Sequence, residues 1–161
     1  MTLIEVVVAM GILTLLGVSL LGMLMQSLRG WASGSGNEAA NSTATTALHR
    51  LTFDIREGRS AVVSSGQLIV TFPALITDTG TGEQIYDSKL NNPVPRSYYV
   101  SGGNLVRNVG GTISILRRGI SSATFVAAAN SIEITLVSTK QLGTSVCTQQ
   151  ATGCVTFRNY Y

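Results

Sequence analysis

The chain has 161 residues, of which 45% are hydrophobic and only 12% are charged, and its formal net charge is +3. This length allows one small domain beside a membrane-length segment and excludes two independent cores. The sequence has one histidine and no GxSxG, P-loop or HExxH pattern, so we expect no enzyme, cofactor or metal site.

Residues 1–28 are predicted to form an apolar helix. About 20 consecutive apolar residues give a helix roughly 30 Å long, which is enough to cross a bilayer. Glu5 is the only charged residue before Arg29, and a charge in such a segment indicates a functional site by default. A secretory signal peptide would carry basic residues before its apolar core. A plain membrane anchor, the second alternative, has no use for Glu5.

The natural partner of Glu5 is an α-amino group. If Met1 is a true N-terminus, its positive charge lies four residues from Glu5. The pair could close within one chain, or it could join Glu5 of one helix to Met1 of the next and set an axial register. The sequence alone leaves both possibilities open.

The start Met1-Thr2-Leu3-Ile4-Glu5, followed by a long apolar helix, resembles the N-terminus of a mature type IV pilin or pilin-like protein. That family commonly begins with Phe, which Met1 replaces here. The resemblance implies that a prepilin peptidase removes a short leader, that the numbering is that of the processed subunit, and that the first residue is methylated. It also makes Met1, Thr2 and Glu5 the expected assembly residues.

Gly17, Ser19 and Gly22 form a locally weak stretch of this helix, since each glycine costs about 1 kcal/mol relative to alanine. In assembled type IV filaments the corresponding stretch often extends, so the resemblance implies loss of helical hydrogen bonds around residues 14–23. A continuous helix that uses these small residues for packing is the alternative, and the sequence does not decide between them.

Residues 29–58 are expected to form an amphipathic second half of the helix, weakened or bent near 34–36, where Gly34, Ser35 and Gly36 follow one another. Apolar residues then recur at three- and four-residue spacing, as on a helix face covered by a sheet. Gly58 is the expected helix stop. Asp54 and Glu57 are predicted to be exposed charges of little energetic weight.

Residues 59–161 are predicted to form a β-rich globular domain, because the apolar period falls to two. The expected fold class is α+β, with a long N-terminal α-helix and an antiparallel sheet packed on its second half. Residues 74–95 are predicted to be irregular. Strands are expected at 61–63, 67–72, 96–100, 104–108, 113–117, 120–126, 132–137 and 155–160.

All 11 basic residues, but only seven of the eight acidic ones, follow residue 28, so the domain is basic. Arg117 and Arg118 are adjacent and give a possible nucleic-acid contact, while solvated charges and subunit salt bridges are the alternative. Asp78, Glu83 and Asp87 are spaced like calcium oxygens, but they lack an EF-hand pattern and are better explained as a solvated loop.

Cys147 and Cys154 bracket a six-residue segment near the C-terminus. Export of the domain, which the apolar helix implies, would place them in an oxidising compartment, so a disulfide is predicted and free thiols are the alternative. The resemblance to pilins implies the same pairing.

The sequence therefore predicts a structural subunit of a type IV pilus or related filament, with other copies, the inner membrane, the prepilin peptidase and the assembly machinery as partners. The subunit would sit in the inner membrane before assembly and in an extracellular pilus afterwards. Adhesion, twitching movement, DNA uptake or secretion would follow. A minor pilin or a type II secretion pseudopilin in a periplasmic filament is the alternative, and a DNA-binding competence pilin comes third.

Overall fold

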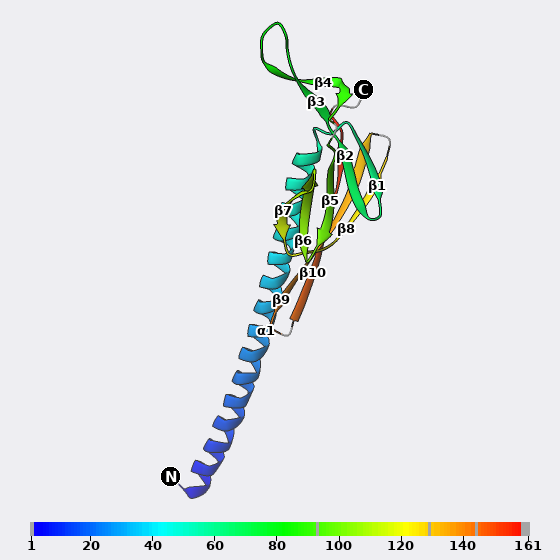
Figure 1. Cartoon of the computed structure of the whole chain (residues 1–161). Helices are drawn as coiled ribbons and strands as arrows, with labels where there is room; N and C mark the ends of the chain where they lie inside the picture. The colour runs from blue at the N-terminus through cyan, green and yellow to red at the C-terminus, as the bar shows by residue number, and fades with distance from the viewer. Residues whose placement is uncertain (1, 93, 129, 144, 159–161) are drawn as a thin grey trace.

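The computed structural model describes residues 2–92, 94–128, 130–143 and 145–158 of the chain (Figure 1). One helix, α1 (Leu3–Ile55), runs alone through its N-terminal half and then along a domain of antiparallel strands. The expected α+β class, with a long N-terminal helix and a sheet domain on its second half, is confirmed.

The two halves of α1 differ in what their side chains contact. Residues 2–31 are all exposed, whereas the second half buries one stripe at three- and four-residue spacing. This stripe is made of small residues where the helix first meets the strands and of larger ones where it ends: Gly36, Ala40, Ala44, Ala47, Leu51 and Ile55. The small residues let strands come close to the helix, and the larger ones fill the core.

Helix α1 passes through residues 34–36 without a break in its helical assignment. It ends at Ile55, three residues before Gly58. Gly58 is buried, and a Cβ there would lie 2.5 Å from Cγ1 of Val70 and 2.9 Å from the carbonyl oxygen of Ile55. Glycine is therefore required at this turn because the chain passes too close to the sheet for any side chain.

The strands form two main antiparallel sheets. One has the order β1-β2-β5-β6-β7 and the other the order β10-β9-β8. The bounds of the first sheet are β1 (Ser60–Ser64), β2 (Gln67–Thr71), β5 (Arg96–Ser101), β6 (Asn104–Val109) and β7 (Thr112–Arg118). Those of the second are β8 (Ile120–Ala127), β9 (Ser131–Leu142) and β10 (Ser145–Thr156).

A third, separate hairpin corrects the prediction that residues 74–95 are irregular. Strands β3 (Pro73–Thr77) and β4 (Gln84–Asn91) pair only with each other and project beyond the end of the domain (Figure 1). We call residues 73–91 the arm. The alternation of its strands is weak and is interrupted by a register shift at Pro73, which explains why the sequence pattern missed it.

The core lies where α1 meets both main sheets. Leu51 and Ile55 of the helix pack with residues of the five-stranded sheet, such as Leu68 and Tyr98, and of the three-stranded sheet, such as Ile134. Each of these side chains is 0% exposed. All members of this core cluster lie between residues 47 and 157, so the domain is built without the N-terminal half of the helix.

Candidate functional site

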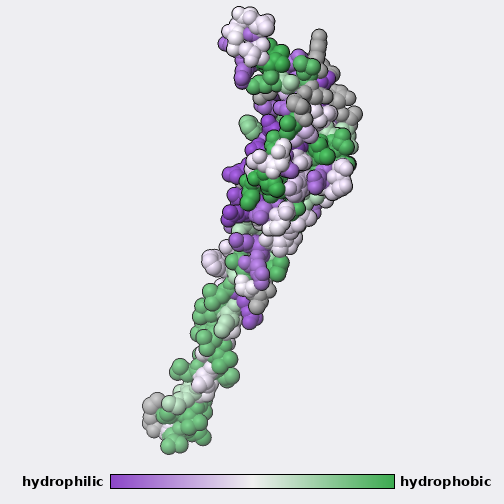
Figure 2. Space-filling model, viewed as in Figure 1, coloured by the Kyte–Doolittle hydropathy of each residue, from purple (hydrophilic) through white to green (hydrophobic). Residues whose placement is uncertain are grey.

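The most unusual surface of the molecule is the apolar half of α1. No side chain of its most apolar window is buried, and the helix is long and apolar enough to cross a membrane. Figure 2 shows this half as a nearly continuous hydrophobic rod below a mixed domain. An exposed apolar surface of this extent marks a membrane or protein contact.

Glu5 lies at the first turn of this rod. The backbone N–H of Thr2 donates to Oε2 of Glu5 at 2.8 Å, and Thr2 has extended backbone angles, as the residue before a helix does. Glu5 thus closes half of a capping box, and its negative charge faces the positive end of the helix dipole. The amine expected to pair with it, at Met1, lies outside the described residues.

The predicted flexible stretch is helical in the single chain. A Cβ at Gly17 or Gly22 would meet nothing within 4 Å, and the Ser19 hydroxyl donates to the carbonyl oxygen of Leu16 at 2.9 Å. By contrast, a Cβ at Gly153 would lie 3.1 Å from Leu48 Cδ2, so Leu48 would have to shift. No contact within the described chain therefore requires glycine at 17 or 22.

The predicted disulfide between Cys147 and Cys154 is wrong for this fold. Both cysteines are free and lie on one continuous strand, β10, seven residues apart. That spacing separates their Cα atoms by about 23 Å and points them to opposite faces, whereas a disulfide needs about 4.4–6.8 Å. Cys147 is buried against α1, with its Sγ 3.7 Å from the Ser33 carbonyl oxygen, and Cys154 is exposed.

Arg117 and Arg118 lie at the end of β7, the edge strand beside α1, and the structure adds a third arginine. Nη1 of Arg50, on α1, donates to the carbonyl oxygen of Leu116 at 2.9 Å. These residues line a surface hollow of about 470 Å³, which we call the arginine hollow: Arg50, Ile115, Leu116, Arg117 and Arg118. The sequence identified the adjacent pair but not that Arg50 joins it, because Arg50 is 66 residues from Leu116.

The arginine hollow continues into an apolar neighbour of about 440 Å³ lined in part by His49, Phe53 and Ile115. Phe53 is 81% exposed and Ile115 is 51% exposed. The flank formed by α1 and β7 therefore combines guanidinium groups with exposed apolar side chains.

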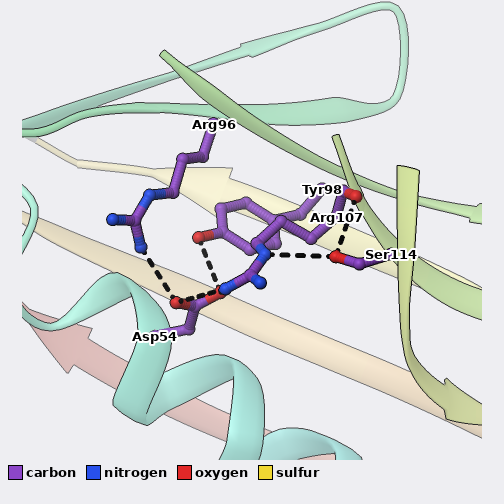
Figure 3. A network of polar contacts seen from close by, with 5 residues as sticks. All are labelled: Asp54, Arg96, Tyr98, Arg107 and Ser114. Carbon is purple, nitrogen blue, oxygen red and sulfur yellow. Dashed lines mark hydrogen bonds and ion pairs between the residues drawn. The ribbon is translucent and has the colours of Figure 1, made fainter. Parts of the chain in front are cut away.

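Asp54 is not the exposed helix charge that the sequence predicted. Its side chain is 16% exposed and lies 3.1 Å from Nη1 of both Arg96 and Arg107 (Figure 3). The Tyr98 hydroxyl donates to Oδ2 of Asp54 at 3.0 Å, and Nε of Arg107 donates to Ser114 at 3.3 Å. One carboxylate of α1 thus joins strands β5 and β6, and Arg107 extends the network to Ser114 of β7.

We call Asp54, Arg96, Tyr98, Arg107 and Ser114 the aspartate clamp. Burial, reinforced by the Asp54 charge, raises the pKa of Tyr98 above its ordinary value. Arg96 also stacks over Phe72, with its guanidinium carbon 4.0 Å from the ring centroid. The geometry of the clamp is that of a brace between helix and sheet. The position of Asp54 between Leu51 and Ile55 of the buried stripe was the signal for it.

The three acidic residues of the arm do not form a ligand set among the described residues, where no group of three His, Cys, Asp or Glu side chains could hold a metal ion. Asp78 instead holds its own turn, accepting from the Thr81 hydroxyl at 2.8 Å and from the Gly80 N–H at 3.2 Å. These bonds, led by that from Thr81, lower the pKa of Asp78 and keep it ionised.

No family model matches this chain, and neither a curated protein nor a solved structure is significantly similar to it.

Proposed function

We propose that the chain is a subunit of a type IV pilus or related type IV filament. The observation that carries the proposal is a membrane-length apolar helix, wholly exposed and charged only at Glu5, that continues directly into a folded domain. Bundling such helices would remove their apolar surface from lipid or water and leave the domains outside as a sheath.

The exposed apolar half of α1 supports a membrane stage in this proposal. Before assembly the apolar half holds the subunit in the inner membrane while the domain lies outside it. A prepilin peptidase frees the amine of Met1, and the assembly machinery then extracts the subunit into an extracellular pilus. The stretch around Gly17, Ser19 and Gly22 gives the helix a place to extend, because glycine weakens a helix and a Cβ at Gly17 or Gly22 would meet nothing within 4 Å in the described chain.

Glu5 has a role in assembly beyond capping its own helix. A carboxylate offers two oxygens and about four lone-pair sites, so the bond from Thr2 leaves capacity for a second donor. The amine of a neighbour's Met1 would be that donor, and in a low-dielectric bundle the pair would fix one axial register.

The test separates capping from pairing. Glu5→Gln keeps an oxygen for the Thr2 N–H, since glutamine also serves in a capping box, but it removes the charge. We expect filaments sheared from the source cells to fall at least about tenfold, because close charge pairs contribute about 1.5–7 kcal/mol. The amount of subunit in the membrane should stay unchanged.

Glu5→Ala, which removes both the cap and the charge, is the matched comparison. If Glu5→Gln cells make filaments in normal amount while Glu5→Ala cells do not, Glu5 is a cap and its pairing role is refuted. If no sheared filament contains this chain at all, the filament proposal itself fails.

A minor pilin or a type II secretion pseudopilin uses the same helix and differs in abundance and in the length of the filament. The arginine hollow favours a further candidate, a DNA-binding competence pilin, because three arginines line one surface hollow. That function predicts DNA binding that weakens steeply with salt and is lost when Arg117 and Arg118 are both replaced by alanine.

A further inference from the structure

Charge is distributed unevenly between the arm and the rest of the domain. Residues 73–91 contain three acidic residues, Asp78, Glu83 and Asp87, and one basic residue. The remainder of residues 29–161 contains ten basic residues and only four acidic ones. The arm is therefore an acidic projection from a basic body.

The acidic tip of the arm is a defined structure. The Asp78 N–H donates to the Glu83 carbonyl oxygen and the Gly82 N–H to the Asp78 carbonyl oxygen, both at 2.8 Å. The hydroxyl of Thr81 and the N–H of Gly80 hold the Asp78 carboxylate in its ionised form. The side chain of Glu83 is exposed beside it. The tip thus presents fixed negative charge to solvent.

Apolar side chains are exposed on both strands of the arm. Leu75 is 48% exposed and Ile85 is 45% exposed, on strands that pair only with each other. A two-stranded hairpin with no further cover is marginally stable in water. The arm therefore has the form of an element that is completed by contact with another surface.

The arginine hollow and its apolar neighbour have the complementary composition. Arg50, Arg117 and Arg118 supply positive charge, and Phe53 and Ile115 supply exposed apolar surface. Figure 2 shows hydrophilic residues along the flank of the domain below the arm, where Figure 1 places α1 and β7. An acidic arm with apolar sides and a basic hollow with an apolar neighbour match in both respects.

We propose that the arm of one copy docks in the arginine hollow of a second copy, an inference that rests on the proposed filament function. The arm points away from the N-terminal end of α1, and β7, whose residues line the hollow together with Arg50, lies on the flank between them (Figure 1). The arm of a chain is thus directed away from its own hollow. In parallel copies displaced along the helix axis, the arm of one lies level with the hollow of the next.

Such a contact is heterologous, because one copy contributes the arm and the other the hollow. Heterologous contacts that do not close into a ring generate open helical filaments. The proposed docking would therefore add a contact between domains to the bundling of the helices.

Cross-linking of full-length chains tests this. In a Cys154→Ser background, one tagged chain carries Glu83→Cys and a second, differently tagged chain carries Arg118→Cys, and both are co-expressed. Mild oxidation of membranes and sheared filaments should give a mixed dimer at least about tenfold above the control, since docking creates a millimolar effective concentration. The control replaces Glu83→Cys by Glu133→Cys, an exposed carboxylate position on β9.

Charge reversal gives a second readout. Glu83→Lys and Arg118→Glu should each lower the yield of filaments, and the double variant should recover it, whereas Glu133→Lys should leave it unchanged. No recovery in the double variant, or equal loss with Glu133→Lys, would overturn the proposed docking.

The outcomes separate this inference from the filament proposal. Filaments that contain the chain but give no cross-link above the control would overturn the docking alone. A cross-link in membranes without any filament would support the docking and refute the filament function. Salt-sensitive DNA binding lost in Arg118→Glu, with no cross-link, would assign the hollow to nucleic acid and overturn the docking.

Discussion

Gly36 shows how one residue positions the helix against the sheet. A Cβ at this position would lie 2.6 Å from Sγ of Cys147 and 2.8 Å from Cδ1 of Leu142. The Leu142 methyl group can turn away. Sγ of Cys147 is bonded directly to Cβ, so it can move only by rotation about the Cα–Cβ bond. Gly36 is therefore fixed by the close approach of α1 and β10, and the cost of glycine within a helix is offset by packing.

Gly36→Ala is expected to destabilise the domain by about 1–3 kcal/mol, the usual cost of overpacking. The matched control is Gly34→Ala, where a Cβ meets nothing within 4 Å and higher helix propensity should stabilise by up to about 1 kcal/mol. Urea unfolding of the full chain in detergent measures both. Equal stability of the two variants would show that α1 and β10 do not lie in this contact.

Sequence reasoning found the residues whose meaning is local. Glu5 stands out because its neighbours along the chain are apolar, and Arg117 and Arg118 stand out as a pair. The partners of Asp54 are 42 to 53 residues away, so only the folded sheet shows that it is a brace. The cysteine pairing was wrong for the same reason, because spacing along the chain does not reveal that one strand holds both.

At the scale of elements, the aspartate clamp couples the end of α1 to the five-stranded sheet. Asp54 comes from the helix, and Arg96, Tyr98 and Arg107 come from β5 and β6. The Tyr98 ring is 0% exposed and its hydroxyl bonds to the carboxylate. The raised pKa of Tyr98 follows from that burial first and from the charge of Asp54 second.

This clamp predicts loss of stability in alkali. Tyrosine in the unfolded chain ionises near pH 10, while Tyr98 in the folded chain stays protonated to higher pH. Above about pH 10 the unfolded state therefore binds fewer protons, and the free energy of unfolding should fall by up to about 1.4 kcal/mol per pH unit. Below about pH 10 the stability that protonated Tyr98 contributes is fully present.

Tyr98→Phe should remove this slope, while costing about 0.5–1.5 kcal/mol at neutral pH for the lost hydrogen bond. Urea unfolding at neutral and alkaline pH checks both effects. Tyr99→Phe, on the opposite face of β5, is the control and should keep the slope. If the free energy of unfolding of Tyr98→Phe falls with pH as steeply as that of the wild type, the clamp is contradicted.

The strands with the clearest apolar alternation or turn residues were the ones predicted most closely. Strands β2, β5 and β6 have apolar alternation or turn glycines beside them and lie within about two residues of their expected positions. The arm was missed because turn residues recur along 74–95, so the whole segment was interpreted as irregular although it contains two strands. Strand β10 was missed in part because it is polar and rich in Thr and Gln. It pairs with β9 along its whole length, but the alternation of its own residues does not indicate that pairing.

At the scale of the whole molecule, stability and association belong to different parts of one helix. The core cluster lies between residues 47 and 157, and residues 2–31 are all exposed. The apolar half therefore contributes nothing to the packing of the domain within a single chain. Under the proposed function a membrane or neighbouring copies would bury this half, and the chain could pass from one to the other without refolding its domain.

A chain that lacks residues 1–28 is therefore expected to fold as a water-soluble domain. Its free energy of unfolding should lie within about 0.5 kcal/mol of that of the full chain in detergent, as for surface changes that remove no packing. Urea unfolding measures the stability, and analytical ultracentrifugation should show a monomer where the full chain without detergent associates. A truncated chain that aggregates, or that unfolds without cooperativity, would mean that the apolar half supports the domain it joins.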